Sequence, residues 1–405
     1  MRRSGGPVTL AAMLLLAAMG LGAWWLSRPP PAVPPPPRLV LDPVSFKDLA
    51  GWRQDSHGAA LLAFLRSCRR FARWPETRPL GPGGIAGRVG DWRPLCAEAG
   101  EVEARDHVVA RQFFEARFTP LAVRQGEDAD GLFTGYYEPL LSGSRRQSER
   151  YAVPLHRRPD DLVRADLGRF DAKLKGRRIT GRVAKGRLVP YPDRAAIETK
   201  GLGEAAVLLW VDSAVDAFFL HIQGSGRVRL DDGGEARVGY AGQNGRRYYA
   251  IGRELIKRGA LTRQNVSMQS IRAWLETNPA EGAKVMRLNP SYVFFRELEG
   301  EGPIGALGVA LTPGRSIAID RRRLPLGVPV WLEASAPAAD AAAPDRPLRR
   351  LMVAQDTGGA IRGAVRGDVF WGHGAEAAAV AGRMKHAGRW YLLLPKAVAA
   401  KAADG

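Results

Sequence analysis

The chain has 405 residues, of which 45% are hydrophobic and 25% are charged, so it is long enough for two domains with well-filled cores. Its 47 glycines and 29 prolines predict many turns, and therefore a β-rich protein rather than a helical bundle. The formal net charge of +19 favours an anionic partner: nucleic acid, membrane headgroups or an acidic polymer. The basic residues are spread along the chain, and no zinc-finger spacing, RNP-like signature or P-loop occurs, so we do not expect nucleic acid.

Residues 1–28 are expected to form a membrane anchor or a signal segment. Residues 8–26 are uncharged and mostly apolar, and they end near Trp24 and Trp25, where an interfacial aromatic belt would place them. This stretch is long enough to cross a bilayer and long for a cleaved signal peptide. We therefore expect an uncleaved anchor with the rest of the chain exported, and secretion after cleavage is the alternative. Residues 29–37, PPPAVPPPP, predict a stiff extended spacer.

Two packing helices are expected after the spacer. Apolar residues recur at helical spacing over 59–72 and again over 104–118. On the first helix, the residues expected on the buried face are Leu61, Leu62, Phe64 and Leu65. The two cysteines, Cys68 and Cys96, are equally compatible with a disulfide and with two free thiols. No histidine lies near them, so they do not indicate a metal site.

Two segments carry residues suited to binding a sugar. Residues 131–138 predict a strand whose tyrosines and Thr134 could line a groove. The alternative is an ordinary strand, because aromatic residues are common in strands. The apolar runs over 151–240 predict short strands of a small barrel or sandwich, and the last of them runs through 218–222. A polar loop, 223–226 (QGSG), follows, and its glycines would let a ligand approach the backbone; a plain β-turn is the alternative. We expect His221 in this run to be structural.

The next part of the chain is expected to be helical over 249–257 and 270–276 and to return to strands over 289–333. Asp320 closes an alternating strand and is followed by three arginines. It is either a third carboxylate near the same sheet or a strand-end residue paired with those arginines.

The densest stretch, residues 351–374, contains two carboxylates. Each follows or lies in a short apolar run, Asp356 after the first and Asp368 in the second, beside Phe370 and Trp371. We expect two strands with a tight connection that brings the carboxylates together beside aromatic rings, as a sugar-cleaving site requires. The alternative is that both are turn formers. A flexible loop is expected over 334–347, a helix over 375–386 and a final strand over 390–394.

Together these segments resemble the MltA family, the membrane-bound lytic murein transglycosylases A. The matching stretches are TGYYEP (134–139), FFLHIQGSG (218–226), VGYAGQNGRRYYAIG (238–252), NPSYVFF (289–295), LTPGRSIAID (311–320) and AQDTGGAIRGAVRGDVFWG (354–372). The resemblance implies a mainly β fold with flanking helices. A double-psi β-barrel, built from 38–139 and 289–398, would carry an inserted second β-barrel-like domain over 140–288, with a groove between them.

The resemblance also implies a function and a site. The function would be cleavage of the MurNAc–GlcNAc β-1,4 bond of peptidoglycan glycan strands, with formation of 1,6-anhydro-MurNAc and without a metal or cofactor. Asp368 would be the catalytic residue and Asp356 and Asp320 supporting carboxylates. The groove would be lined by Thr134, Gly135, Tyr136, Tyr137, Gln223, Gly224, Ser225, Gly226 and Trp371. The chain would work in the periplasm, held at the inner membrane by residues 8–26, with other cell-wall enzymes as candidate partners. It lacks the family's lipid-attachment cysteine, so outer-membrane anchoring is not expected.

The expected chemistry needs one carboxylate. A general acid protonates the glycosidic oxygen, so its pKa must be raised. The apolar neighbours of Asp368 and the nearby Asp356 would both raise it, and Arg362 and Arg366 would oppose them if they reached Asp368. The sugar's own C6 hydroxyl then attacks and gives its proton to the same residue. The alternatives are a two-carboxylate inverting hydrolase, a dimeric aspartic protease built on the Asp356-Thr357-Gly358 signature, and a non-catalytic wall-binding protein.

Overall fold

The computed structural model describes residues 38–300 and 302–403. The expected anchor and spacer lie outside the described residues. Within the part of the chain that is described, no helix is both long and apolar enough to cross a membrane.

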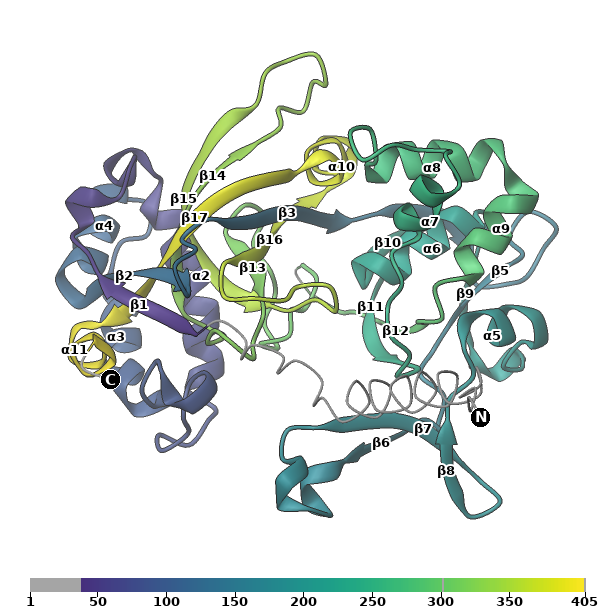
Figure 1. Cartoon of the computed structure of the whole chain (residues 1–405), viewed down its shortest axis with the longest axis horizontal. Helices are drawn as coiled ribbons and strands as arrows, with labels where there is room; N and C mark the ends of the chain where they lie inside the picture. Colours follow the sequence, from purple (N-terminus) through teal and green to yellow (C-terminus); the bar gives the residue numbers. More distant parts are fainter. Residues whose placement is uncertain (1–37, 301, 404–405) are drawn as a thin grey trace, which may run out of the picture. The chain divides into compact units, whose positions relative to one another are not determined.

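Six strands close into a barrel (Figure 1). They run in the order β17-β14-β15-β13-β16-β3, and β3 pairs back onto β17. Two pairs, β13 with β15 and β16 with β3, are parallel, and the others are antiparallel. Closure removes the exposed strand edges. The strand bounds are β3 (Gly131–Glu138), β13 (Ser316–Ile319), β14 (Pro329–Ala336), β15 (Arg346–Asp356), β16 (Arg366–His373) and β17 (Lys385–Pro395). Two further strands, β1 (Leu39–Pro43) and β2 (Phe118–Gln125), extend the sheet beyond β17.

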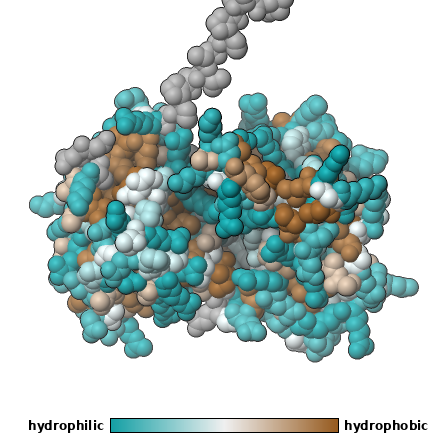
Figure 2. Space-filling view, turned by 90° about the horizontal axis from the view of Figure 1, so that it is seen from below, coloured by the Kyte–Doolittle hydropathy of each residue, from teal (hydrophilic) through white to brown (hydrophobic). Residues whose placement is uncertain are grey.

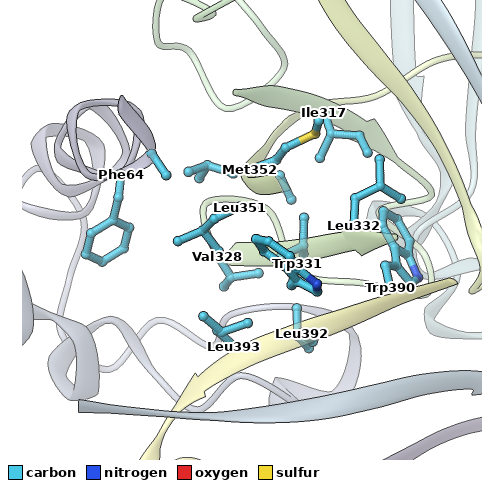
Figure 3. Close-up of a cluster of buried hydrophobic side chains, with 14 of the residues drawn as sticks. Phe64, Ile317, Val328, Trp331, Leu332, Leu351, Met352, Trp390, Leu392 and Leu393 are labelled. Atoms are coloured by element: carbon cyan, nitrogen blue, oxygen red, sulfur yellow. The ribbon is translucent and has the colours of Figure 1, made fainter. Parts of the chain in front are cut away.

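Large side chains at successive positions of the barrel strands are buried, so both faces of these strands are packed (Figure 3). Trp331 and Trp390 are both almost completely buried, and Phe64 from a covering helix belongs to the same cluster. The covering helices are α2 (His57–Phe71), α3 (Val89–Glu101) and α4 (His107–Arg117). The two expected helices are confirmed. Leu62 was wrongly expected on the buried face; its side chain is 53% exposed.

A disulfide between Cys68 and Cys96 joins α2 to α3 and decides between the two alternatives left open by the sequence. Helix α3, which contains Pro94, was not predicted. The barrel is completed by α10 (Gly374–Arg383) and by α11 (Lys396–Ala403). The loop expected over 334–347 is shorter than expected, since Ala336 pairs with Arg346 at the end of the β14–β15 ladder.

A second six-stranded sheet forms the other β-domain, in the order β12-β11-β10-β4-β9-β5. A β-bridge between Arg157 and Phe295 joins its two ends, which makes it barrel-like. The mainly β fold with two β-domains is therefore confirmed. The strands are β4 (Leu140–Ser144), β5 (Val153–His156), β9 (Val207–Val211), β10 (Ser225–Leu230), β11 (Glu235–Gln243) and β12 (Val293–Glu297). Strand β12 lies beyond residue 288, where the insertion was expected to end, yet it pairs with β11.

The helices of this domain are α5 (Arg194–Lys200), α6 (Ala214–Gln223), α7 (Ile251–Lys257), α8 (Met268–Thr277) and α9 (Pro279–Arg287). Helix α6 corrects the expected strand over 218–222. Its N-cap Ser213 accepts a hydrogen bond from the Asp216 amide, and Gly224 ends it in the left-handed conformation at φ 81°. A short, almost continuous apolar run fits a buried helix as well as a strand, so periodicity could not separate them.

A third sheet consists of β6 (Val163–Asp166), β7 (Arg178–Ala184) and β8 (Arg187–Pro190). Figure 1 shows it as a separate small sheet, drawn in teal. The connection from β6 to β7 contains the short helices η4 (Leu167–Arg169) and η5 (Ala172–Leu174). The remaining short helices are η1 (Phe46–Asp48), η2 (Trp52–Gln54), η3 (Pro82–Gly84) and η6 (Glu204–Ala206).

Candidate active site

The barrel register places two carboxylates at the same level. Ala318 of β13 pairs with Asp356 on one side and with Asp368 on the other. Strand β13 therefore lies between β15 and β16, which corrects the expectation of two directly connected neighbouring strands. Two strand spacings separate the backbones of the two aspartates by about 10 Å. The carboxylates are brought together by a crossover, not by a hairpin.

Asp368 has one carboxylate oxygen engaged and one free. Its Oδ1 accepts a hydrogen bond from Arg366 Nη1 at 2.8 Å, and Arg366 Nη2 donates to Thr134 Oγ1 at 2.9 Å. No described residue donates a hydrogen bond to its Oδ2. About a fifth of the Asp368 side chain, 22%, is exposed. Burial raises the pKa of Asp368, and the charge and hydrogen bond of Arg366 act against that rise.

Asp356 is saturated by hydrogen bonds. Its Oδ2 accepts from Tyr136 Oη at 2.8 Å, and its Oδ1 accepts from the amides of Ala306 at 2.9 Å and Thr357 at 2.8 Å. Burial raises the pKa of Asp356, the charge of Asp368 acts in the same direction, and the three hydrogen bonds oppose both. Burial and the neighbouring Asp356 also raise the pKa of Tyr136, so its hydroxyl stays protonated and donates.

Asp320 connects two loops through hydrogen bonds. It is buried, and it accepts hydrogen bonds from the Arg322 amide at 3.1 Å, the Arg322 guanidinium at 3.1 and 3.3 Å, and the Gly363 amide at 3.1 Å. Burial alone would raise the pKa of Asp320, but these hydrogen bonds outweigh it and lower that pKa. This geometry matches the alternative in which a strand-end aspartate pairs with a following arginine.

Aromatic rings lie beside the carboxylates. The rings of Tyr136 and Phe370 are 5.2 Å apart between centroids. Gly135 makes room for Trp371, because a Cβ at position 135 would lie 2.7 Å from the indole Nε1. That Nε1 atom is buried and has no hydrogen-bond partner among the described residues. Of the predicted groove residues, Tyr136 bonds to Asp356 and Thr134 bonds to the arginine that holds Asp368, whereas Trp371 packs beside Gly135 and α10.

Comparison with known proteins matches this site to one family. The MltA specific insert domain matches residues 132–296, and the 3D domain matches 315–394, which includes all three aspartates. A membrane-bound lytic murein transglycosylase A from Escherichia coli strain K12 is 34% identical over 275 residues, which are 66% of this chain and 68% of the relative. The chain belongs to the MltA family.

Solved structures of MltA proteins share the fold. The membrane-bound lytic murein transglycosylase from Agrobacterium tumefaciens is 34% identical with a TM-score of 0.80, and the match covers 89% of this chain and 99% of that one. The E. coli MltA structure with bound chitohexaose is 26% identical with a TM-score of 0.63, and the match covers 90% of this chain and 95% of that one.

The second predicted groove segment of this MltA chain is tightly packed. Gln223 ends α6, and its Oε1 accepts a hydrogen bond from the Tyr137 amide at 3.1 Å. Gly224 is the helix C-cap, and Ser225 pairs with Gly239 in the β10–β11 ladder. A Cβ on Gly226 would lie 2.5 Å from Leu220 Cδ1. Packing explains Gly226 and capping explains Gly224, and the segment predicted as a polar loop is the end of α6 followed by the start of β10.

The neighbouring Tyr137 and His221 are structural. Tyr137 is buried against α10, and burial raises the pKa of its hydroxyl. His221 is buried, and its Nδ1 accepts a hydrogen bond from the Val293 amide at 3.0 Å. Burial lowers the pKa of His221 well below its usual value, so the ring is neutral. The structural role expected for His221 is confirmed.

Two groups near the site were missed or left open by the sequence. Arg366 does reach Asp368, which the sequence left undecided. Glu138, at the end of β3, is 1% exposed and lies 3.6 Å from Arg227 and 3.8 Å from Arg237. Burial raises the pKa of Glu138, and the two arginines oppose that rise. In the sequence, only the position of Glu138 after two tyrosines could have indicated that it lies near the site. No cluster of three metal-ligating side chains exists in the described residues.

Proposed function

We propose that this MltA-family chain is a peptidoglycan lytic transglycosylase, a carbon–oxygen lyase in which Asp368 is the single catalytic residue. The observation that carries the proposal is the contrast among the three carboxylates. Both oxygens of Asp356 and of Asp320 accept hydrogen bonds, whereas Asp368 keeps Oδ2 without a partner among the described residues. An acid with a raised pKa and a free oxygen is suited to deliver a proton to a substrate.

The reaction begins with the protonated Asp368. Its proton goes to the glycosidic oxygen between MurNAc and GlcNAc, the bond from C1 of MurNAc to that oxygen breaks, and the GlcNAc end leaves as an alcohol. Positive charge builds on C1. The C6 hydroxyl of the same MurNAc forms a new bond to C1 and gives its proton to the Asp368 carboxylate. The products are a 1,6-anhydro end and a regenerated acid, with no water consumed.

The other carboxylates have supporting roles in this proposal. Asp356, fixed by Tyr136 and two amides, stabilises the developing cation. Asp320 holds the loop that carries Gly363. We assign substrate contact to Thr134 and Tyr136, because Tyr136 donates to Asp356 and Thr134 shares Arg366 with Asp368. Trp371 packs against Gly135 and α10 and supports the wall behind them. For Gly135, Tyr137, Gln223, Gly224, Ser225 and Gly226 the packing indicates that they shape the groove walls.

The substrate and location follow from the family. The E. coli relative whose structure contains chitohexaose binds a linear amino-sugar oligomer, and we extend glycan-strand binding to this chain. We propose that it works in the periplasm, that residues 8–26 tether it to the membrane, and that the barrel is built from residues on both sides of the inserted domain.

The test is digestion of purified peptidoglycan by the full chain and by Asp368→Asn, followed by mass spectrometry of the muropeptides. Products lighter by one water than hydrolytic products, absent for Asp368→Asn, are expected. Asp160→Asn changes an exposed aspartate and serves as the matched control, with unchanged activity expected. Products with ordinary reducing ends would instead identify a hydrolase. Anhydro products that persist at wild-type rate with Asp368→Asn would move the catalytic role to Asp356.

A further inference from the structure

The third sheet, β6–β7–β8, has one apolar face, and that face is exposed rather than buried. In an antiparallel ladder, paired residues point to the same face. Val163 pairs with Gly181, Ala165 with Ile179, and Val183 with Leu188. Because successive residues alternate between faces, all of these belong to one face. That face presents Val163, Ala165, Ile179, Val183, Leu188 and Pro190.

The apolar face is exposed. The exposed fractions are 61% for Val183, 45% for Ile179, 41% for Leu188 and 37% for Val163. Phe170, in the connection between β6 and β7, is 80% exposed. Figure 2 views the molecule from the side on which Figure 1 draws this sheet, and it shows hydrophobic surface bordered by hydrophilic residues. A contiguous exposed apolar surface of this kind marks an interaction site.

The opposite face of the sheet is the one directed at the rest of the protein. Thr180, one residue away from Ile179 and therefore on that opposite face, lies against the turn at Gly245. A Cβ on Gly245 would be 2.8 Å from the Thr180 Cβ. Arg164 pairs with Thr180 and shares this face. The apolar face therefore points away from the body of the protein.

The rim of the sheet is strongly basic. Residues 163–190 contain nine lysines and arginines but only two aspartates. One of the arginines, Arg178, forms an ion pair with Asp166 at 3.4 Å. In the β6–β7 connection and the β7–β8 turn, five basic residues are exposed and form no ion pair with any described residue: Arg169, Lys173, Lys175, Arg177 and Lys185.

We propose that the β6–β7–β8 sheet docks on an anionic lipid bilayer, with the apolar face and Phe170 at the headgroup boundary and the basic rim on the lipid phosphates. Apolar side chains surrounded by cations are the composition that binds such an interface. A wall polymer would match the charge but leave the apolar face uncovered. A second copy of the sheet would cover the apolar face but bring two basic rims together.

The expected tether makes this contact reachable. Only the nine residues 29–37 separate the end of the expected anchor segment, residue 28, from the described body. A body tethered by residues 8–26 would therefore stay within reach of the bilayer surface. The docking does not depend on the catalytic role of Asp368, so each proposal can fail without the other.

The test uses single cysteines in the full chain, whose two native cysteines are joined in a disulfide. An environment-sensitive nitrobenzoxadiazole dye is attached to Val183→Cys, on the apolar face, or to Arg182→Cys, the adjacent residue on the opposite face. Both proteins are reconstituted into vesicles of phosphatidylglycerol with phosphatidylethanolamine and into vesicles of phosphatidylcholine. A tether acts equally in both, so the difference between the lipids reports docking of the sheet.

The expected result is a blue-shifted and brighter emission from the label at 183 in the anionic vesicles and no such change from the label at 182. Replacing Lys173, Lys175 and Lys185 by alanine should lower the docking equilibrium on the order of 100-fold, about fivefold for each cation. Peptidoglycan digestion by each variant verifies that it is folded. An unchanged emission at 183 in both lipids overturns the proposal. A change produced by soluble wall fragments, or one that depends on protein density, also overturns it, in favour of a wall contact or a second copy.

Discussion

Replacing Arg366 by glutamine should move the pH dependence of cleavage. Arg366 donates to Asp368 Oδ1 at 2.8 Å, and the two side chains are 14% and 22% exposed. A hydrogen bond between charged groups with this burial is worth more than a surface ion pair, and we take about 1.5 kcal/mol. That free energy corresponds to about one pKa unit. Since Arg366 holds the pKa of Asp368 down against burial, its removal should raise that pKa by about one unit.

The direction of the pH shift follows from the role of Asp368 as the general acid. Asp368 must be protonated to act, so activity falls as pH rises above its pKa. In Arg366→Gln the alkaline limb of kcat/KM, measured as release of anhydro-muropeptides, should therefore shift upward by about one unit. Arg362→Gln is the matched control, because among the described residues the Arg362 side chain donates only to the carbonyls of Ile361 and Gly358. An alkaline limb that stays in place or moves downward, in a folded variant, would refute the general-acid assignment or the coupling to Arg366.

Three further predictions concern stability. The disulfide closes a sequence separation of 28 residues, so Cys68→Ser with Cys96→Ser should lower the free energy of unfolding by about 3.5 kcal/mol, measured by urea titration; equal stability of variant and wild type would contradict this. Gly135→Ala should cost about 1–3 kcal/mol in the same assay, because its Cβ would meet the Trp371 indole and the backbone of Ala381. A neutral effect would mean that both the ring and α10 shift without cost. Burial lowers the pKa of His156 to about 4. The unfolded chain therefore binds an extra proton below about pH 6.5, and stability should fall by up to about 3 kcal/mol as pH drops from there to the folded pKa. His156→Gln should flatten that slope, and an unchanged slope would place the acid sensitivity elsewhere.

Local patterns in the sequence were enough to predict the family, the helices α2 and α4, and the strands that carry Asp356 and Asp368. Each of these rests on short-range periodicity or on motif letters, which act within one element. The neutral, buried role of His221 was also foreseen, since an isolated histidine in an apolar run is most often structural.

Contacts between distant segments were decided only by the tertiary structure. Strand β13 inserts between β15 and β16, so Asp356 and Asp368 meet through a crossover that no local pattern encodes. Both carboxylate oxygens of Asp356 accept hydrogen bonds, whereas only one oxygen of Asp368 does. This difference depends on Tyr136, which lies 220 residues before Asp356 in the sequence and donates its hydroxyl to Asp356.

The same distinction applies to burial. The apolar run through 218–222 is a helix because capping at Ser213 and Gly224 and its packing against neighbouring elements select it over a strand. On the β6–β7–β8 sheet, alternation in the sequence gives one apolar and one basic face, but only the register and the position of Gly245 show that the apolar face is left uncovered. The amino-acid sequence determines which faces are apolar, and the free energy of packing the whole chain determines which of those faces are buried.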